Sequence, residues 1–348
     1  MINSRRIKST IACVLAFGIL LTGCSGDNNT EGKPAATAEG GEVKEYKYGE
    51  IEIPALDGAL CGAPLYIAYE KGFLAEEGFD AKLTAADFET KKVGLNNGTI
   101  PLVNGDFQFF PSIEQGVKVK VVDGMHNGCI KVVTSKDSGI KSAADLKGAK
   151  IGVDEIGGTT FQATSLWLEN NGIEAENNKD VTFVPYSDGN LEIEAVEKGE
   201  IKAAAVWDPL GSQAINEKGF VELFDLATDK LFADKFCCFY FASEKVAEEN
   251  PEEIAAILRA LRKAENWIVE NTEEAVKIIG EGDYSSITDE KLAADLLKSY
   301  AFPKEGEDID RKLTESVVYF SKELAKIDYL ETDDGEAFAK EILIDNLN

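Results

Sequence analysis

The sequence is poor in the residues that hydrolytic enzymes use for catalysis. It contains a single histidine, His126, and no arginine between Arg6 and Arg259. It has no G-x-S-x-G nucleophile elbow, no H-E-x-x-H zinc motif and no phosphate-binding P-loop. With a single histidine, the only pair of a nucleophile and a histidine base that the sequence offers is Cys129 with His126. We therefore expect a protein that is not an enzyme and that needs no cofactor.

Positive charge is also scarce. Lysine and arginine total 36 against 63 aspartates and glutamates, a formal net charge of −27. Because such a surface repels phosphates, and no run of basic residues opposes it, we exclude nucleic acid as a partner. We expect the nearest basic residues to a central site, Lys131 and Lys136, to lie on the solvated surface. The shortage of cations favours a small neutral, zwitterionic or weakly anionic ligand over a strong anion.

The N-terminus is typical of an exported protein. Arg5, Arg6 and Lys8 precede an apolar run, 11–20, which is too short to span a bilayer as a permanent helix. The sequence LTGC at 21–24 resembles a bacterial lipobox, in which cleavage precedes the cysteine and lipid is attached to its sulfur. A secretory signal with a chance cysteine is the alternative.

We expect residues 1–23 to be a lipoprotein signal peptide and Cys24 to carry palmitate-like acyl chains that anchor the chain to the membrane. Residues 24–45 contain almost nothing apolar, which predicts a flexible tether. The globular body would then lie at the extracytoplasmic face of the cell membrane.

The body of the chain alternates between short apolar runs and longer amphipathic runs. This order of strands and helices, with short connections, predicts an α/β fold with sheets covered by helices. The expected strands are 51–55, 79–85, 100–103, 117–122, 130–134, 151–153, 181–184, 203–207, 220–224 and 235–242. The expected helices are 64–77, 89–97, a segment ending at 115, 141–146, 161–168, 191–198, 208–218 and those from 251 onward.

One stretch, 149–168, combines a buried strand, a glycine turn and a helix start. Gly157, Gly158, Thr159 and Thr160 separate the strand from the helix. The free N–H groups of a helix start and its dipole can hold an anion or a polar ligand group. An ordinary turn with an N-cap is the alternative.

Four segments in this order resemble a known family. They are 62–83 (GAPLYIAYEKGFLAEEGFDAKL), 105–122 (GDFQFFPSIEQGVKVKVV), 137–153 (DSGIKSAADLKGAKIGV) and 206–209 (VWDP). Together they are similar to the solute-binding proteins of ABC importers for nitrate, sulfonates, taurine and thiamine-pyrimidine precursors. The resemblance runs from about residue 50 to about residue 270.

The resemblance implies a type II periplasmic-binding-protein fold, in which two α/β lobes are joined by two crossover strands and hold a ligand between them. It places lobe one at 46–131 and lobe two at 132–236. Residues 237–348 would return to lobe one as a strand and C-terminal helices. It also implies a monomer that delivers its small-molecule ligand to a membrane permease with a cytoplasmic ATPase.

The family's ligand-binding loops map onto four short segments of this chain. We expect Gly62 and Gly158 to allow close approach of the backbone, and Trp207 to form a wall of the site. Helix capping is the alternative role for both aspartates in the set, and core packing is the alternative for Trp207. The predicted ligand-binding residues are Cys61, Gly62, Ala63, Asp106, Phe107, Gly158, Thr159, Thr160, Trp207 and Asp208.

Four cysteines, Cys61, Cys129, Cys237 and Cys238, map to the cleft loop and to the two crossovers. Three interpretations remain open: a disulfide such as Cys61 with Cys129, buried structural thiols, or a soft-metal or thiol-ligand site that includes His126. Cys237 and Cys238 also resemble the cysteine-rich strand of thiamine-pyrimidine synthases that share this fold. Such an enzyme is the alternative function, although its cofactor lysine and sacrificial histidine have no counterpart that we can place.

Overall fold

The structure is a computed structural model that describes residues 45–175, 179–304, 306–344 and 347. The predicted signal peptide (1–23), the lipid site Cys24 and all of the predicted tether except its last residue lie outside this part of the chain. Within the described residues, no helix has both the length and the apolar character needed to cross a membrane. Residues 45–348 form one compact unit.

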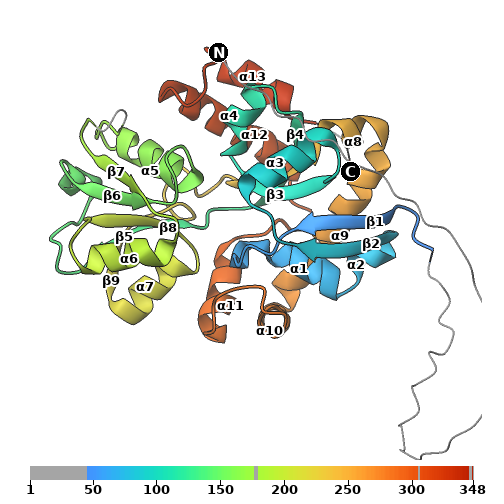
Figure 1. Cartoon of the computed structure of the whole chain (residues 1–348), viewed down its shortest axis with the longest axis horizontal. Coiled ribbons are helices and arrows are strands. Elements are labelled where there is room, and N and C mark those ends of the chain that lie inside the picture. The colour runs from blue at the N-terminus through green and yellow to red at the C-terminus, as the bar shows by residue number, and fades with distance from the viewer. Residues whose placement is uncertain (1–44, 176–178, 305, 345–346, 348) are drawn as a thin grey trace, which may run out of the picture. The chain divides into compact units, whose positions relative to one another are not determined.

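Five strands build lobe one, as we call the half that contains the start of the described chain (Figure 1). β1 (Gly49–Pro54) pairs in parallel with β2 (Phe79–Thr84). β10 (Cys238–Ser243) lies between β3 (Leu102–Asp106) and β4 (Val119–His126) and is antiparallel to both. β1 contacts β3 but shares no ladder with it in the described chain, so this lobe has two hydrogen-bonded groups of strands.

Lobe two is built on a single five-stranded sheet in the order β7-β6-β8-β5-β9. β6 is parallel to β7 and β8, whereas β5 is antiparallel to β8 and β9. The strands are β5 (Ile130–Ser135), β6 (Lys150–Val153), β7 (Thr182–Pro185), β8 (Ala203–Trp207) and β9 (Phe220–Asp225). Three fully buried alanines, Ala203, Ala204 and Ala205, give the central strand β8 little side-chain bulk, which suits a strand covered by helices on both faces.

The chain crosses between the lobes twice. The first crossover, 127–129, joins β4 to β5, and the second, 226–237, returns from β9 to β10. All six residues of β10 are buried, as expected for an apolar strand inserted between two neighbours. The predicted return of the chain to lobe one at this aromatic run is therefore confirmed.

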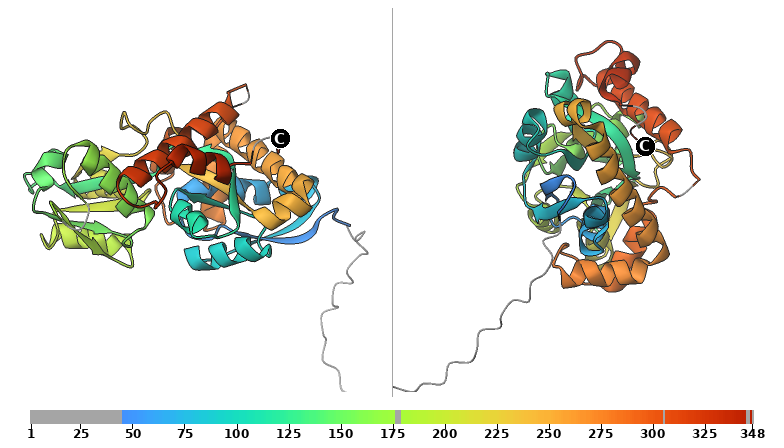
Figure 2. Two further views of the ribbon diagram at one scale, coloured as in Figure 1. Left: turned by 90° about the horizontal axis from the view of Figure 1, so that it is seen from above. Right: turned by 90° about the vertical axis from the view of Figure 1, so that its right-hand side faces the viewer.

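Helices cover the strands of both lobes, and the C-terminal helices pack mainly on lobe one (Figure 2). The 20-residue helix α9 (Pro251–Glu270) buries one apolar face, including Ile254, Leu258 and Leu261. It packs against α1 (Ala63–Glu70) and α2 (Phe73–Glu76). Helices α12 (Ile309–Lys326) and α13 (Gly335–Ile342) contact β4. Helix α12 also contacts α5 (Thr159–Asn170) of lobe two. These contacts confirm the expected α/β fold with C-terminal helices on the first lobe.

The remaining elements complete the order of the chain. The lobe-one helices before β4 are η1 (Leu60–Gly62), α1 (Ala63–Glu70), α2 (Phe73–Glu76), α3 (Phe88–Asn97) and α4 (Phe109–Glu114). Lobe two contains η2 (Ala143–Leu146), α5 (Thr159–Asn170), α6 (Gly189–Glu197) and α7 (Leu210–Lys218). After β10 come α8 (Glu244–Glu249), α9, α10 (Thr272–Glu281), α11 (Glu290–Ser299), α12 (Ile309–Lys326) and α13 (Gly335–Ile342).

Candidate functional site

A cavity of ≈ 440 Å³ lies between residues of the two lobes. Lobe one contributes the segments after β1 and β2 and the end of β3 with the residues that follow it. Lobe two contributes 207–210, which begin at the last residue of β8. Binding sites of open α/β sheets form at these carboxyl ends of strands. The lining residues are Asp57, Gly58, Ala59, Cys61, Ala86, Asp87, Phe88, Lys91, Asn104, Gly105, Asp106, Gln108, Phe109, Trp207, Asp208, Pro209, Leu210, Cys238 and Ser286.

Four of the ten predicted ligand-binding residues line this cavity: Cys61, Asp106, Trp207 and Asp208. The other six are Gly62, Ala63, Phe107, Gly158, Thr159 and Thr160, and the structure places them beside the cavity or in the core. Phe107 is fully buried and stacks on Phe320 with ring centroids 4.3 Å apart.

The two glycines permit close packing within the protein. A Cβ on Gly62 would lie 2.6 Å from the hydroxyl oxygen of Tyr66, and one on Gly158 would lie 2.6 Å from Cγ of Glu155. A side chain on Gly62 would therefore clash with the buried Tyr66, whereas one on Gly158 would have to displace the side chains of Glu155 and Asp154.

The glycine turn before α5 contacts lobe one directly. The buried Thr159 hydroxyl donates a 2.6 Å hydrogen bond to Oδ1 of Asp106, at the end of β3. The same carboxylate oxygen accepts a 2.8 Å bond from the backbone N–H of Gln108. The side chain of Gln108 in turn donates to Glu155 of lobe two. The expected helix start is thus present, and its first side chain binds the opposite lobe.

Asp154 joins the turn to the aromatic wall of the cavity. Its carboxylate accepts a hydrogen bond from the Thr160 hydroxyl and one of 3.2 Å from the indole N–H of Trp207. These bonds fix the half-buried Trp207 ring at the end of β8. Trp207 is therefore held by polar contacts at the rim of the cavity and is not a fully buried core residue.

Lys131 is buried, contrary to our expectation of a solvated lysine. Its ammonium group forms an ion pair with Asp225 and lies 3.7 Å from Asp208, and its side chain is only 9% exposed. The sequence did not reveal this because both carboxylates come from strands or strand ends far along the chain. Lys136 is exposed, as predicted.

Two carboxyl groups at the cavity hold protons more tightly than usual. Burial raises the pKa of Asp106 to about 6, even though the bonds from Thr159 and Gln108 act in the opposite direction. Burial likewise raises the pKa of Asp208 to about 6, against the attraction of Lys131. Both groups therefore change charge close to neutral pH.

The lining is rich in acceptors and poor in cations. It contains four aspartates, Asp57, Asp87, Asp106 and Asp208, and a single basic residue, Lys91. The Lys91 ammonium lies 3.4 Å from the carboxylate of Asp57, so its charge is already balanced. Such a site attracts hydrogen-bond donors and positive groups, and it repels strong anions.

Sequence reasoning missed most of the lobe-one lining. Asp57 and Asp87 come shortly after the ends of β1 and β2, and the predicted Asp106 is the last residue of β3, so the strand-end rule would have found them. Lys91 lies one helical turn into α3, beyond Asp87, the N-cap of that helix. Ser286 comes from the loop between α10 and α11, and no local signal marks it.

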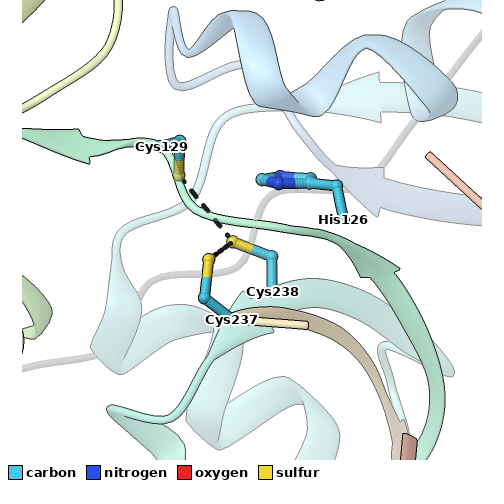
Figure 3. Close-up of side chains that lie close together, drawn as sticks. All are labelled: His126, Cys129, Cys237 and Cys238. Carbon is cyan, nitrogen blue, oxygen red and sulfur yellow. Dashed lines mark hydrogen bonds between the residues drawn. The ribbon is translucent and has the colours of Figure 1, made fainter. Parts of the chain in front are cut away.

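The four cysteines of the described chain are buried free thiols, so the disulfide between Cys61 and Cys129 is not present. Cys129, Cys237 and Cys238 gather beside His126, where the crossovers meet lobe one (Figure 3). His126 is the last residue of β4 and is fully buried.

Comparison with known proteins supports this description. The nitrate/nitrite binding protein NrtA of Nostoc is 24% identical over 336 residues, which cover 85% of this chain and 73% of that protein. The structure is similar to the periplasmic nitrate-binding protein NrtA of Synechocystis, with a TM-score of 0.67, 18% identity and 86% coverage of both chains.

It is also similar to the periplasmic aliphatic sulphonate binding protein SsuA of Escherichia coli, with a TM-score of 0.65, 18% identity and coverage of 83% of this chain and 91% of that one. These likenesses show the periplasmic-binding-protein fold. Residues 62–275, well over half of the chain, match the family described as NMT1/THI5 like. The chain belongs to the family described as NMT1/THI5 like.

Proposed function

We propose that this protein captures a small neutral or positively charged molecule between its lobes and delivers it to the permease of an ABC importer. The observation that carries the proposal is the cavity lining, with four aspartates and one lysine that is already paired. A nitrate or sulfonate group would meet carboxylates there without a free cation to balance it. The nitrate and sulphonate named for the related proteins are therefore not the ligands that we propose for this chain.

The side chains that line the site favour a flat ligand with hydrogen-bond donors. Phe88, Phe109 and Trp207 supply aromatic surface, while Asp57 and Asp106 supply acceptors. An aminopyrimidine of the kind that precedes the pyrimidine ring of thiamine combines a flat ring with amino donors. We propose this class as the ligand, ahead of taurine-like or sulfonate-like solutes.

The interlobe contacts supply a mechanism of capture. Asp106 and Thr159 already bridge the lobes at the cavity, so a ligand that touches both lobes adds contacts only when they are together. Ligand binding would then stabilise the closed arrangement by the difference in contacts. We propose the divisions 46–131, 132–236 and 237–348 for lobe one, lobe two and the returning segment, except that residues 130 and 131 begin β5 and so belong to lobe two.

The remaining parts of the proposal concern location and partners. A lipid on Cys24 and a tether over 24–45 would hold a monomer at the extracytoplasmic face of the membrane, beside its permease and ATPase. Mass spectrometry of the mature protein tests the anchor: an N-terminal diacylated Cys24 supports it, and an unmodified N-terminus contradicts it.

A thermal-shift screen tests the ligand class. The panel contains an aminopyrimidine alcohol, primary amines, taurine, an alkanesulfonate and nitrate. A ligand selective for the folded state raises the melting temperature in proportion to the logarithm of its concentration over its Kd. We expect the aminopyrimidine to raise it and nitrate to leave it unchanged; a shift with nitrate alone contradicts the proposed ligand class. Turnover of any member of the panel would favour an enzyme.

A further inference from the structure

One ring nitrogen of His126 and the sulfur atoms of Cys129, Cys237 and Cys238 all lie within 4.8 Å of one another (Figure 3). The sulfur of Cys238 is 3.8 Å from that of Cys129 and 3.4 Å from that of Cys237. In a tetrahedral zinc site with Zn–S bonds of about 2.3 Å, the donor atoms lie about 3.7 Å apart. The two sulfur–sulfur distances are therefore close to this value, and small movements would bring the remaining donor atoms, at most 4.8 Å apart, around a single ion.

The histidine is oriented as metal-binding histidines are. Nδ1 of His126 contacts the backbone carbonyl of Asn127, whereas the buried Nε2 has no hydrogen-bond partner in the part of the chain that the structure describes. A carbonyl partner at one nitrogen leaves the lone pair on the other available to a metal. Stacking on Tyr300, with centroids 5.0 Å apart, fixes the ring. A buried nitrogen without a partner is costly, and a bound ion would satisfy it.

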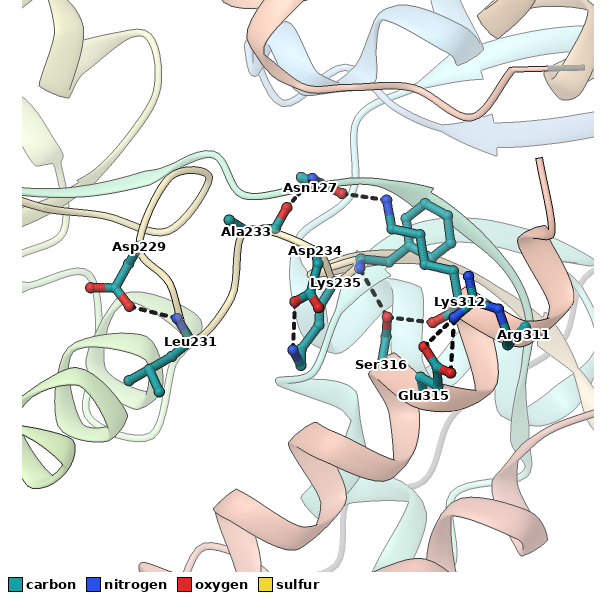
Figure 4. A network of polar contacts seen from close by, with 11 residues as sticks. Asn127, Asp229, Leu231, Ala233, Asp234, Lys235, Arg311, Lys312, Glu315 and Ser316 are labelled. Carbon is teal, nitrogen blue, oxygen red and sulfur yellow. Dashed lines mark hydrogen bonds and ion pairs between the residues drawn. The ribbon is translucent and has the colours of Figure 1, made fainter.

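A second layer of contacts holds the cluster in place (Figure 4). The amide of Asn127 donates a 2.7 Å bond to the carbonyl of Ala233 and accepts a 2.8 Å bond from the Lys312 ammonium. Ser316 accepts a 3.0 Å bond from the backbone N–H of Phe236. Helix α12 thus ties both crossovers together beside the cysteines.

We propose that His126, Cys129, Cys237 and Cys238 form a tetrahedral Zn²⁺ site that joins the two crossovers. Three thiols lose their protons to solvent when the ion binds, which leaves a complex of charge −1. Lys312, which interacts electrostatically with Cys237, supplies a nearby positive charge. All four ligands are at most 5% exposed, which is typical of a closed, structural zinc site.

The site would link metal binding to the ligand cavity. Cys129 is the last residue of the first crossover, and Cys237 is the last residue of the second. An ion bound to both would restrict the relative movement of the segments through which the lobes open. Cys238 also lines the cavity, so the metal would lie directly behind the ligand. This inference does not depend on which molecule the cavity binds.

Cobalt substitution tests the site on the full chain, purified in detergent under reducing conditions and freed of metal by chelation. Co²⁺ should bind in a 1:1 ratio and give an intense thiolate-to-cobalt charge-transfer band, and Zn²⁺ should displace it. Cys129→Ser should weaken the band at least several-fold. Thr164→Val is the control, because Thr164 is a buried residue of α5 outside the cluster and its substitution should leave the band intact.

X-ray absorption of the zinc-loaded native chain gives a test that requires no variant. We expect a first shell of three sulfur atoms and one nitrogen atom. A shell dominated by oxygen, or the absence of a charge-transfer band with Co²⁺, would overturn the proposal. So would a cobalt band whose intensity Cys129→Ser leaves unchanged.

Discussion

The hydroxyl of Thr159 donates a 2.6 Å hydrogen bond to Oδ1 of Asp106, and this bond joins the first turn of α5 in lobe two to the end of β3 in lobe one. Because the acceptor is a buried carboxyl group, the bond is a candidate latch between the lobes. A hydrogen bond to a charged group contributes about 1.5–3 kcal/mol. The loss of that energy would shift the unliganded protein towards separated lobes.

We therefore expect Thr159→Val to increase the radius of gyration of the unliganded protein in solution, as measured by small-angle X-ray scattering. Thr164→Val is the matched control. It lies in the same helix and is fully buried, and its hydroxyl has no hydrogen-bond partner within the described chain. Equal radii for Thr159→Val and the native protein would show that the bond is not a latch.

Trp207 should report ligand binding through its fluorescence. The chain has three tryptophans, and Trp207 is the one that lines the cavity. A ligand that stacks on Trp207 should change the emission of the native protein, and Trp207→Phe should abolish that change. Trp267→Phe removes a half-buried ring on α9 and should leave the change in place. A ligand-induced change that survives Trp207→Phe would remove this residue from the site.

Glu192 makes stability depend on pH. Burial raises its pKa to about 9, and Oε2 has no hydrogen-bond partner in the described chain. A carboxyl group whose pKa is higher in the folded state than in the unfolded state loses stabilisation as pH rises from about 4.5 to about 9. At neutral pH the penalty is of order 3 kcal/mol, because one pKa unit corresponds to about 1.4 kcal/mol.

We expect Glu192→Gln to raise the free energy of unfolding at neutral pH and to flatten its decline between pH 5 and pH 8, as measured in urea. As a control, Glu200→Gln at an exposed position should change the free energy of unfolding by about 0.5 kcal/mol or less. An unchanged pH profile for Glu192→Gln would show that this carboxyl group is not the source.

Lys131 should be essential for the stability of lobe two. Lys131→Met leaves Asp208 and Asp225 buried without their cation, and loss of one partner of a buried ion pair typically costs about 3–5 kcal/mol. We expect a decrease of that order in the free energy of unfolding. The exposed Lys136 provides the control, since Lys136→Met should change stability by about 0.5 kcal/mol or less. Similar effects of the two substitutions would contradict the buried ion pair.

Local patterns in the sequence predict the main elements of the fold well. The apolar alternation of 51–55 predicts β1, and the aromatic run at 235–242 predicts a strand that returns to lobe one. The end of β4 was missed because Asp123 and Gly124 look like a loop. In the structure, Asp123 is buried in the strand because Arg262, from the distant helix α9, forms an ion pair with it.

The candidate site depends more strongly on contacts that no local pattern contains. The strand-end rule placed Asp106, Trp207 and Asp208 at the cavity, because their positions follow from the topology of an α/β sheet. It could not show that Thr159 would bind Asp106, or that Ser286 would reach the same cavity from the loop after α10. The convergence of the cysteines was predicted from the crossovers, but the orientation of His126 required coordinates.

The central claim is that the lobes bind a neutral or positively charged ligand against ionisable aspartates. A calorimetric titration of an aminopyrimidine alcohol and of nitrate, each well above and well below pH 6, tests it most directly. For a positively charged donor, ionisation of Asp106 and Asp208, whose pKa values are both about 6, should strengthen binding as pH rises through that value. We expect saturable 1:1 binding of the aminopyrimidine and none of nitrate. Tight binding of nitrate that weakens as pH rises, with none of the aminopyrimidine, would contradict the account.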